Sequence, residues 1–467
     1  MEYQVIIIGG GPGGYECAIR LAQYGKQVLL VERDQLGGTC LNRGCIPTKT
    51  VLHTAELYQE LREGAAIGLQ AENLSVDYAA LRNRKEQVSA QLREGIAGLL
   101  KQNGVTVLQG TGIVTAPGTV EVTDSEGAKT VFTAENIVVA VGSRPVLLPI
   151  PGADLEGVWT SDHILAELPQ LNSLTIIGGG VIGIEMASAY SALGTKVTVV
   201  EAADRILPIL DRDVAQYVGA ALKKQNVSIF AGAKVTGIEK AENGLRCNFV
   251  TSKGEETFAE GDAVLLSVGR RANTDTVFGC ELGLSIERGR VNVDEHMLAA
   301  PGLYVIGDAV NGYAQLAHVA SAQGLAAAAH IAGEAFHTDL TLVPSCVYTT
   351  PEIAAVGLSE GEAKAKGIPV KTGKFLMGAN GKSLISGQGG FIKVIADEND
   401  KLVGALLYCA RATDMVGELA LAIAQGLTLH QFASLIRPHP TVEEAVGEAA
   451  EAVFGRAIHM APPRKKK

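Results

Sequence analysis

Two cysteines, Cys40 and Cys45, are separated by four residues in the segment Gly37–Lys49. Such a pair could be half of a metal site, although no second cluster of Cys or His with suitable spacing follows. The thiols could also be inert core residues, as cysteines often are. A helical run begins directly after Cys45, and a helix N-terminus stabilises a thiolate. A disulfide between the two would need a distorted first helical turn, which Gly44 and Pro47 make plausible.

A second chemical signal is a glycine-rich pattern that occurs twice. Each copy has an apolar run, GxGxxG, a helical pattern, a β-branched run and a glutamate eighteen residues after the third glycine. The first glycine permits a tight turn, the second lets the backbone approach a pyrophosphate, and the third allows close packing of helix and strand. The glutamate would bind an adenosine ribose. The two sets are Gly9, Gly11, Gly14 and Glu32, then Gly178, Gly180, Gly183 and Glu201. Ordinary α/β connections are the alternative, but the complete pattern seen twice favours two dinucleotide sites.

The segments around these motifs indicate how they are positioned. Apolar residues near a 3.6-residue period predict a helix over 78–101. Two similar apolar runs end at Gly142 and Gly269, and we expect them to mark where the chain enters and leaves an inserted domain. From about Leu340 the composition changes, and no further phosphate-binding loop follows. At roughly 150 residues per domain, a chain of 467 residues suggests about three domains.

Composition excludes several classes of protein. The formal net charge of −10 argues against a nucleic-acid binder, which would have a basic face. An apolar content of 47% with 19% charged residues predicts a globular protein with large cores. The segment 309–333 lacks Asp, Glu, Lys and Arg but is mostly alanine, so we expect a buried helix and no membrane span. Seven scattered cysteines and no visible signal peptide predict a cytoplasmic location.

The cysteine segment resembles the redox-active disulfide of the flavoprotein disulfide reductases, and Cys-Leu-Asn-x-Gly-Cys-Ile-Pro-Thr-Lys is most similar to their dihydrolipoamide dehydrogenase branch. The resemblance covers almost the entire chain. Gly307-Asp308 is similar to the family's second flavin signature, and His439-Pro-Thr-Val-Glu-Glu444 to its C-terminal histidine motif. Motifs in this order make membership of the family specific, whereas the substrate is less closely specified.

The resemblance implies an α/β fold with two Rossmann-like dinucleotide-binding domains and a C-terminal α+β dimerisation domain. Residues 1–145 would be the first part of an FAD-binding domain and would carry the redox-active cysteines. Residues 146–270 would be an inserted NAD-binding domain. Residues 271–340 would return to the FAD-binding or central domain, and residues 341–467 would form the dimerisation, or interface, domain.

The resemblance also assigns cofactor residues. The first glycine motif and Glu32 would hold the ADP half of FAD, and Asp308 would contact its ribitol or phosphate region. The FAD site would also include Lys49, Gly142 and Ala317. The second glycine motif and Gly269 would bind NAD. A carboxylate at Glu201 would accept a hydrogen bond from a ribose 2′-OH and repel a 2′-phosphate, which favours NAD over NADP.

The implied catalytic residues begin with the thiols. Cys45 would lie nearest the flavin as the charge-transfer thiolate, and Cys40 would be the interchange thiol that meets the substrate. Lys49 and Glu185 resemble the family's ion pair beside flavin N5, where nicotinamide stacks.

The base of the reaction would be His439, oriented by Glu444. In the family this histidine comes from the other subunit, so a homodimer is implied. The chain has Arg437 where relatives often carry another histidine. We expect this departure to alter local electrostatics and not to abolish the base.

The resemblance therefore implies oxidation of dihydrolipoyl groups with NAD as acceptor, through a redox-active disulfide and FAD. The lipoyl group would be on a separate carrier protein of a 2-oxoacid dehydrogenase or glycine cleavage complex, or would be free dihydrolipoamide. A glutathione-reductase-like enzyme is an alternative, but basic residues would then replace Glu201. A mercuric-reductase-like enzyme would usually end in a cysteine pair. A third alternative is an assembly component that needs FAD only for folding, against which the retained Cys40, Cys45, His439 and Glu444 argue.

Overall fold

The structure is a computed structural model that describes residues 2–461. Within these residues the N-terminal part is built on an eight-stranded sheet whose main path runs β19-β20-β6-β1-β2-β3. Val5–Ile8 and Val28–Val31 are buried on both faces of parallel strands, which explains their continuous apolar character. The strands are β1 (Glu2–Ile8), β2 (Val28–Glu32), β3 (Thr106–Gln109), β4 (Thr111–Ala116), β5 (Thr119–Thr123), β6 (Lys129–Val139), β19 (Leu298–Ala300) and β20 (Leu303–Val305).

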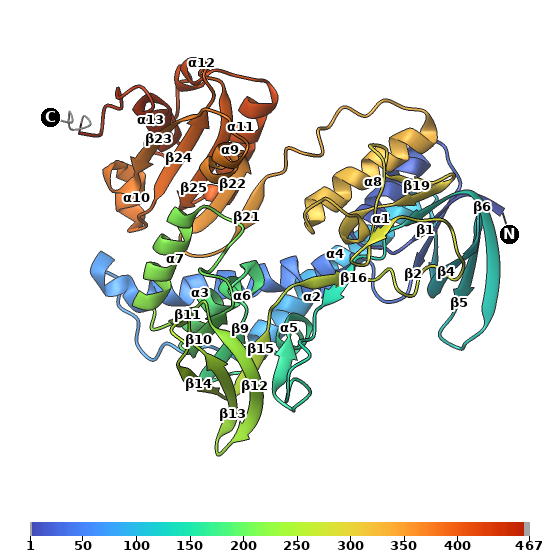
Figure 1. Ribbon diagram of the computed structural model, residues 1–467, viewed down its shortest axis with the longest axis horizontal. Helices are drawn as coiled ribbons and strands as arrows, with labels where there is room; N and C mark the ends of the chain where they lie inside the picture. Colours follow the sequence, from blue (N-terminus) through green and yellow to red (C-terminus); the bar gives the residue numbers. More distant parts are fainter. Residues whose placement is uncertain (1, 462–467) are drawn as a thin grey trace.

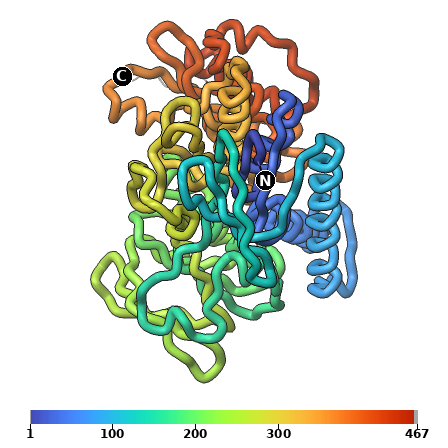
Figure 2. Tube along the Cα trace, turned by 90° about the vertical axis from the view of Figure 1, so that its right-hand side faces the viewer, coloured from blue at the N-terminus to red at the C-terminus, as the bar shows by residue number. Residues whose placement is uncertain are grey.

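The helices of this part carry the first motifs, and two of them, α1 (Pro12–Gln23) and α4 (Tyr78–Gln102), pack against the sheet (Figure 1). They are α1 (Pro12–Gln23), α2 (Gly38–Arg43), α3 (Cys45–Glu63), η1 (Gly64–Ile67), α4 (Tyr78–Gln102), η2 (Gly307–Ala309) and α8 (Ala317–Ala332). The predicted helix 78–101 is α4, which ends one residue later and is capped by the Asp77 side chain. In the perpendicular view of Figure 2, α4 lies along one side of the molecule.

The alanine-rich segment forms α8, which packs directly on α1. The two helices approach so closely at Gly324 that a Cβ there would lie only 2.4 Å from the Gly13 carbonyl oxygen, so a glycine is needed at this position. The small residues of this charge-free segment are therefore used for packing inside the protein. No helix among residues 2–461 has the length and apolar character that a membrane crossing requires.

The second glycine-rich motif lies in a separate parallel sheet with the order β11-β10-β9-β15-β8. Its strands are β8 (Val158–Thr160), β9 (Ser173–Ile177), β10 (Lys196–Glu201), β11 (Ser228–Ala231) and β15 (Ala263–Leu266). The helices of this part are α5 (Ser161–Glu167), α6 (Val181–Ala192) and α7 (Arg212–Lys224), and an antiparallel sheet contains β12 (Lys234–Ala241), β13 (Gly244–Val250) and β14 (Glu256–Gly261). The repeat seen in the sequence thus corresponds to two sheets with the same strand–turn–helix–strand beginning.

The two crossings between these parts lie side by side. Strand β7 (Ser143–Pro145) begins directly after Gly142, and β16 (Arg270–Ala272) directly after Gly269. The two strands pair in antiparallel register. A small hairpin of β17 (Ile286–Glu287) and β18 (Arg290–Val291) follows. The runs that the sequence singled out as entry and exit points are therefore neighbours in space.

The C-terminal part is an antiparallel sheet in the order β21-β22-β25-β24-β23, at the upper left of Figure 1. Its strands are β21 (Ser345–Val347), β22 (Glu352–Gly357), β23 (Lys371–Leu376), β24 (Phe391–Ala396) and β25 (Leu402–Cys409). Its helices are α9 (Glu360–Ala365), η3 (Met377–Ala379), α10 (Gly381–Ser386), α11 (Ala412–Ala424), α12 (Leu429–Ala433) and α13 (Glu444–Ala452). Two parallel-sheet units and this antiparallel one confirm the predicted fold class.

Candidate active site

A cavity of about 1620 Å³ joins the three parts of the chain. Its walls include both glycine-rich turns, the cysteine pair and residues of strand β21. The predicted site residues that line it are Gly9, Gly11, Glu32, Cys40, Cys45, Lys49, Gly142, Gly178, Gly180, Glu185, Glu201, Gly269, Asp308 and Ala317. Side chains that are far apart in the sequence therefore face one space.

The glycines of the two turns divide into two structural roles. Gly11 and Gly180 are the N-caps of α1 and α6, and a Cβ built at Gly180 would meet no atom within 4 Å. Gly14 and Gly183 do not line the cavity. A Cβ at Gly14 would lie 1.9 Å from the Gly9 carbonyl oxygen, and one at Gly183 would lie 2.0 Å from that of Gly178. The open second glycine and the tightly packed third glycine are what a pyrophosphate cradle at a helix N-terminus requires.

The two motif glutamates occupy equivalent positions. Glu32 accepts hydrogen bonds from the backbone nitrogens of Gly10, at 2.6 Å, and Asp34, at 2.8 Å. Glu201 accepts from the backbone nitrogens of Gly179, at 2.5 Å, and Ala203, at 2.6 Å. Each carboxylate therefore ties its glycine-rich turn to the end of the following strand while it faces the cavity.

Burial raises the pKa of Glu32, against the opposing effect of the hydrogen bond from Gly10. Near the second site, Arg205 is bound to Asp204 at 3.1 Å and donates to the Pro208 carbonyl oxygen at 2.9 Å. Its guanidinium is therefore engaged by the loop itself.

The remaining predicted cofactor residues lie around the β7–β16 crossing. Gly142 and Gly269 have positive φ angles of 64° and 117°, and a Cβ at either would meet no atom within 4 Å. The Asp308 carboxylate is 2.5 Å from the Ser143 hydroxyl. Ala317 is the first residue of α8 and lines the cavity near Asp308. These positions leave open space beside backbone amides and one carboxylate.

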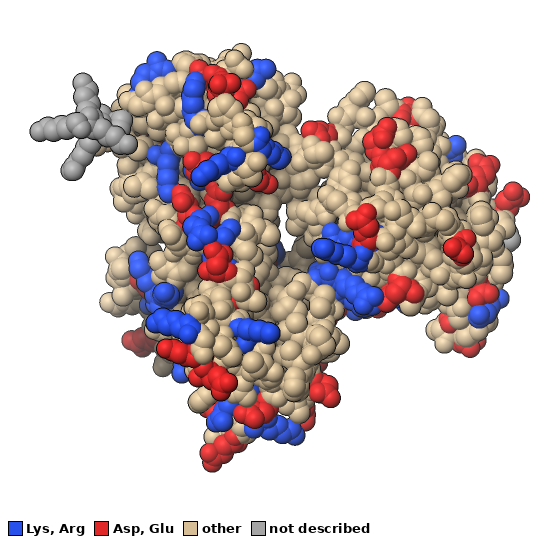
Figure 3. All heavy atoms as spheres, in the orientation of Figure 1, with Lys and Arg blue, Asp and Glu red and all other residues tan. Residues whose placement is uncertain are grey.

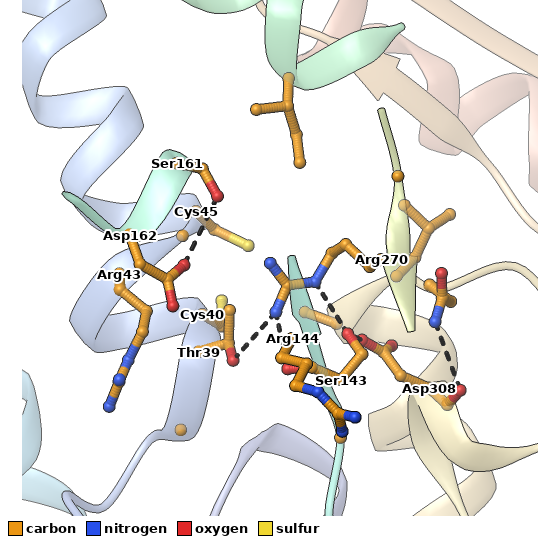
Figure 4. A pocket seen from close by; sticks show the side chains of 18 of the residues that line it. Thr39, Cys40, Arg43, Cys45, Ser143, Arg144, Ser161, Asp162, Arg270 and Asp308 are labelled. Carbon is orange, nitrogen blue, oxygen red and sulfur yellow. Dashed lines mark hydrogen bonds between the residues drawn. The ribbon is translucent and has the colours of Figure 1, made fainter. Parts of the chain in front are cut away.

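Sequence reasoning missed an arginine at this crossing. Arg270 donates from Nε to the Ser143 hydroxyl at 2.8 Å and from Nη2 to the Thr39 hydroxyl at 3.5 Å (Figure 4). It thus connects the Asp308 side of the cavity with the residue next to Cys40. The Gly-Arg-Arg sequence at 269–271 was visible, but nothing local indicates that its first arginine points toward the cysteines.

The residues present fit the two dinucleotides that the motifs predict. The observation that supports this fit is the open space at Gly11 and Gly180. Each of these glycines lies at the N-terminus of a helix and on the wall of the cavity. Bulkier residues at these positions would fill the cradle. The first turn, Glu32 and Asp308 would hold FAD, and the second turn with Glu201 would hold the nicotinamide dinucleotide.

The cysteines are brought together by a break between two helices. Helix α2 contains Cys40 and ends at Arg43, and α3 begins at Cys45. Gly44 between them has φ −141° and ψ −114°, and a Cβ there would lie 2.9 Å from the Thr39 carbonyl oxygen. The sequence favoured a distorted helical turn, and the break at Gly44 provides it. Within residues 2–461 no group of three or more side chains gathers that could hold a metal ion.

The two thiols are unbonded in this structure and interact with each other. The hydrogen bond from Cys40 and the positive charge of Lys49 lower the pKa of Cys45 to about 7, although burial opposes them. The same hydrogen bond and burial raise the pKa of Cys40. Cys45 is therefore the thiol of the pair that ionises first.

Lys49 and Glu185 form an ion pair beside these thiols. Lys49 Nζ is 2.9 Å from Glu185 Oε2, and only 5% of the Glu185 side chain is exposed. The Tyr348 backbone nitrogen donates to Glu185 Oε1 at 3.0 Å, and Lys49 Nζ lies 4.3 Å from the Tyr348 ring centroid. Neither Tyr348 nor Cys346, which also lines the cavity, is singled out by a pattern in the sequence.

His439 and Glu444 are paired at the C-terminal end of the chain. His439 Nδ1 is 2.8 Å from Glu444 Oε1, and the Thr441 backbone nitrogen donates to Glu444 Oε2 at 2.9 Å. The hydrogen bonds from Thr441 and His439 lower the pKa of Glu444. A carboxylate at Nδ1 fixes the orientation of the ring and leaves Nε2 free for chemistry.

This pair does not line the cavity of its own chain, and 79% of the His439 side chain is exposed. The structure thus brings together Cys40, Cys45, Lys49 and Glu185, and it places His439 elsewhere. Arg437 is buried, with Nη2 2.8 Å from Glu418 Oε1. The departure from the family pattern therefore supplies an ion pair that joins the loop carrying His439 to helix α11.

Two nucleotide cradles and a thiol pair around one cavity define a class of protein, the dinucleotide-dependent disulfide oxidoreductases. Residues 3–324 match the family model described as pyridine nucleotide-disulphide oxidoreductase, and residues 343–450 match the dimerisation domain of the same family. The chain belongs to the pyridine nucleotide-disulphide oxidoreductases. Membership implies FAD and NAD(P) as cofactors, and the dimerisation domain supports a homodimer.

Relatives of known function match along the full length. The dihydrolipoyl dehydrogenase of Bacillus subtilis is 40% identical, covering 98% of this chain and 99% of the relative. The mitochondrial dihydrolipoyl dehydrogenase of Pisum sativum is 37% identical, covering 98% and 93%. Among solved structures, LpdA of Mycobacterium tuberculosis has a TM-score of 0.87 at 27% identity, covering 96% and 99%. The HOCl-induced flavoprotein disulfide reductase RclA of Escherichia coli has a TM-score of 0.85 at 28% identity, with the same coverage.

Proposed function

We propose that the protein is a dihydrolipoyl dehydrogenase that oxidises dihydrolipoyl groups with NAD. The observation that carries the proposal is the position of Cys40 and Cys45 on the wall of a cavity shared with both dinucleotide cradles. The identity of 40% to a dihydrolipoyl dehydrogenase along the full chain supports this choice within the family. The division into FAD-binding, NAD-binding, central and dimerisation domains is part of the same proposal.

The substrate half of the reaction is thiol–disulfide exchange at the cysteine pair. In the oxidised protein, a disulfide joins Cys40 to Cys45. One substrate thiolate attacks Cys40 Sγ, which forms a mixed disulfide and releases Cys45 as a thiolate. The second substrate thiolate then displaces Cys40, so the substrate leaves as a cyclic disulfide and both protein thiols are reduced. The lowered pKa of Cys45 suits it to leave as a thiolate.

A base is needed because an ordinary thiol has a pKa near ~8.5 and is mostly protonated at neutral pH. His439 accepts the proton at Nε2, and Glu444 at Nδ1 stabilises the resulting imidazolium. Since His439 does not line the cavity of its own chain, we propose that it serves the cysteine pair of the other subunit of a homodimer. The two active sites would then depend on dimerisation.

FAD, when bound, supplies the two-electron chemistry that connects the reduced thiols to NAD. The chain's own contribution at that step is electrostatic. Lys49 is held in place by Glu185 and Tyr348, and it keeps a positive charge beside Cys45. Glu201 would accept from a ribose 2′-OH, which favours NAD over NADP.

The lipoyl substrate would be presented by a separate carrier protein of a 2-oxoacid dehydrogenase or glycine cleavage complex, in the cytoplasm, or would be free dihydrolipoamide. A second candidate is a reductase for another disulfide. The likeness to RclA, with a TM-score of 0.85, is the observation that favours it.

The test is a comparison of substrate pairs with the purified, FAD-loaded protein. We expect NAD-dependent oxidation of dihydrolipoamide to be faster than NADPH-dependent reduction of glutathione disulfide. Cys45→Ser should abolish the first activity while transfer of electrons from NADH to a dye continues. Faster turnover of glutathione disulfide with NADPH would contradict the proposed substrate.

A further inference from the structure

The loop between β10 and α7, residues 202–211, forms a wall of the cavity beside the second glycine-rich turn. The Leu207 backbone nitrogen donates to the Gly179 carbonyl oxygen at 2.8 Å, so the loop is joined directly to that turn. Pro208 and Ile209 line the cavity, and Ile209 is 73% exposed although it is apolar. Leu207 has a φ of 47°, a conformation that side chains other than glycine adopt only when the surrounding structure holds them there.

The end of this loop is held by a buried lysine from the C-terminal sheet. Lys393 on β24 places Nζ 2.7 Å from Oδ2 of Asp211, the last residue of the loop, and 2.6 Å from Glu360 Oε2. Only 4% of the Lys393 side chain is exposed. Burial opposes the charged form of this lysine, but the hydrogen bonds that it donates to the Asp211 and Glu360 carboxylates raise its pKa. The lysine is therefore a charged anchor that is almost entirely shielded from bulk water.

Helix α7, which follows the loop, packs against the same sheet. Lys374 Nζ is 3.0 Å from Asp213 Oδ2 and 3.9 Å from the Phe391 ring centroid. The Tyr217 and Phe391 rings are 5.0 Å apart. Figure 1 shows α7 next to this sheet, and Figure 3 shows acidic and basic side chains side by side where the two parts meet. The anchor thus connects the loop to a rigid surface.

We propose that Lys393 is a positioning residue for the adenosine half of the dinucleotide at the second site. Lys393 fixes Asp211, and Asp211 fixes loop 202–211 so that Pro208 and Ile209 form an apolar wall for the adenosine. The inference rests on the proposed function only in taking the second cradle as a nucleotide site. If the charge cluster merely joined two parts of the fold, its loss would not change the affinity of the cradle.

The test is calorimetric titration of the FAD-loaded protein with ADP-ribose, which carries the adenosine and pyrophosphate but no nicotinamide. We expect Lys393→Met to weaken binding of ADP-ribose about 10- to 100-fold, because small displacements of positioning groups have effects of that size. Reduction of the flavin by dihydrolipoamide should keep its rate, since it does not use this site. Lys393→Arg keeps the charge and should restore affinity to within about threefold.

Two further variants make the test independent of how well Lys393→Met folds. Asp211→Asn removes the anchor point on the loop and should lose as much affinity as Lys393→Met, with no further loss in the double variant. Glu360→Gln removes the second carboxylate that binds Lys393 but changes no residue of the loop. Its affinity for ADP-ribose should stay within about twofold of that of the unmodified protein.

Binding of ADP-ribose by Asp211→Asn with unchanged affinity would overturn the inference, whatever the behaviour of Lys393→Met. A loss of affinity in Glu360→Gln equal to that in Asp211→Asn would also overturn it, because the cluster would then act through general stability. Failure of dihydrolipoamide to reduce the flavin of the unmodified protein would instead contradict the proposed substrate. Loss of ADP-ribose affinity in Lys393→Met and Asp211→Asn would still support the role of Lys393.

Discussion

Lys49 Nζ lies 2.9 Å from Glu185 Oε2, although the two residues belong to different helices and are 136 positions apart in the chain. Lys49 is on α3, close after Cys45, and Glu185 is on α6, close after the second glycine-rich turn. The Tyr348 backbone adds a hydrogen bond from the C-terminal part. A carboxylate as buried as Glu185 requires such partners, because an unpaired charge is unstable away from water. The three parts of the chain therefore meet at one ion pair beside the reactive thiols.

The first prediction concerns the ionisation of Cys45, because the charges of Lys49 and Glu185 affect the pKa of that thiol. In the protein reduced by two electrons, the long-wavelength charge-transfer absorbance between the Cys45 thiolate and the flavin should appear as the pH rises through about 7. Lys49→Met should move the midpoint upward, because the cation that lowers the pKa is lost. Glu185→Gln should move it downward, because the Glu185 carboxylate raises the pKa of Cys45. The measurement is a pH titration of that absorbance.

Cys45→Ser is the matched control, since it should remove the absorbance at every pH. A midpoint at the ordinary thiol pKa in the unmodified protein, with no movement in either charge variant, would contradict the assignment of Cys45 as the thiolate.

The second prediction concerns the pair of His439 and Glu444. His439→Gln should slow reduction of the flavin by dihydrolipoamide by roughly 10²- to 10⁴-fold, the usual contribution of general base catalysis. Glu444→Gln keeps a hydrogen-bond acceptor at Nδ1 and should cost about tenfold. Oxidation of NADH by dyes should be unaffected in both variants, because it does not need the base.

Stopped-flow measurement of the two half-reactions separates these effects. His296→Gln is a control, because that imidazole is exposed and does not line the cavity. Equal loss of both half-reactions in His439→Gln would count against a role as base for the thiols.

The third prediction uses the geometry of the glycines. Gly183→Ala should lose ADP-ribose binding and retain FAD, because its Cβ would lie 2.0 Å from the Gly178 carbonyl oxygen. Gly14→Ala should fail to retain FAD for the same reason, because its Cβ would lie 1.9 Å from the Gly9 carbonyl oxygen. Gly180→Ala should fold normally and lose affinity only, since its Cβ meets nothing but the space expected for the pyrophosphate.

Flavin content and calorimetric titration check these outcomes. Gly95→Ala, on an exposed position of α4, is the control, and it should raise stability by about 0.5–1 kcal/mol. Normal ADP-ribose affinity in Gly180→Ala would place the pyrophosphate elsewhere.

The fourth prediction concerns the choice of dinucleotide. Glu201→Gln removes the charge that would repel a 2′-phosphate, so the ratio of kcat/KM for NADH to that for NADPH should fall about tenfold or more. Arg205→Ala should leave the ratio near that of the unmodified protein, because Arg205 is already bound to Asp204 and the Pro208 carbonyl. An unchanged ratio in Glu201→Gln would show that another residue selects the dinucleotide.

Much of the fold was predictable because its signals are local. The repeated glycine pattern predicts a strand, a turn and a helix wherever it stands, and α4 follows from apolar periodicity to within one residue. The alanine-rich segment could be identified as a buried helix because residues that small can pack against α1. The sequence offered Gly44 and Pro47 as residues that allow a distorted turn near the cysteines, and the structure places the break at Gly44.

Other features depend on contacts that no local pattern encodes. Tyr348 and Cys346 reach the cavity because β21, about 300 residues after the cysteines, lies at the edge of the C-terminal sheet. Arg270 reaches Thr39 only because β7 and β16 are paired. Lys393 looks like an ordinary strand lysine until loop 202–211 places Asp211 against it.

By itself, the sequence determined the chemical groups and their order: a glycine-rich turn, a thiol pair, a second glycine-rich turn, and a histidine followed by a glutamate. These are short-range properties, because a turn, a helix terminus or a spacing needs only neighbouring residues. Only the tertiary structure decided which groups share a cavity, that the Tyr348 backbone binds Glu185 beside Lys49, and that Arg270 reaches Thr39. Burial and charge pairing are set by residues that are distant along the chain, so they exist only once the three parts have packed together.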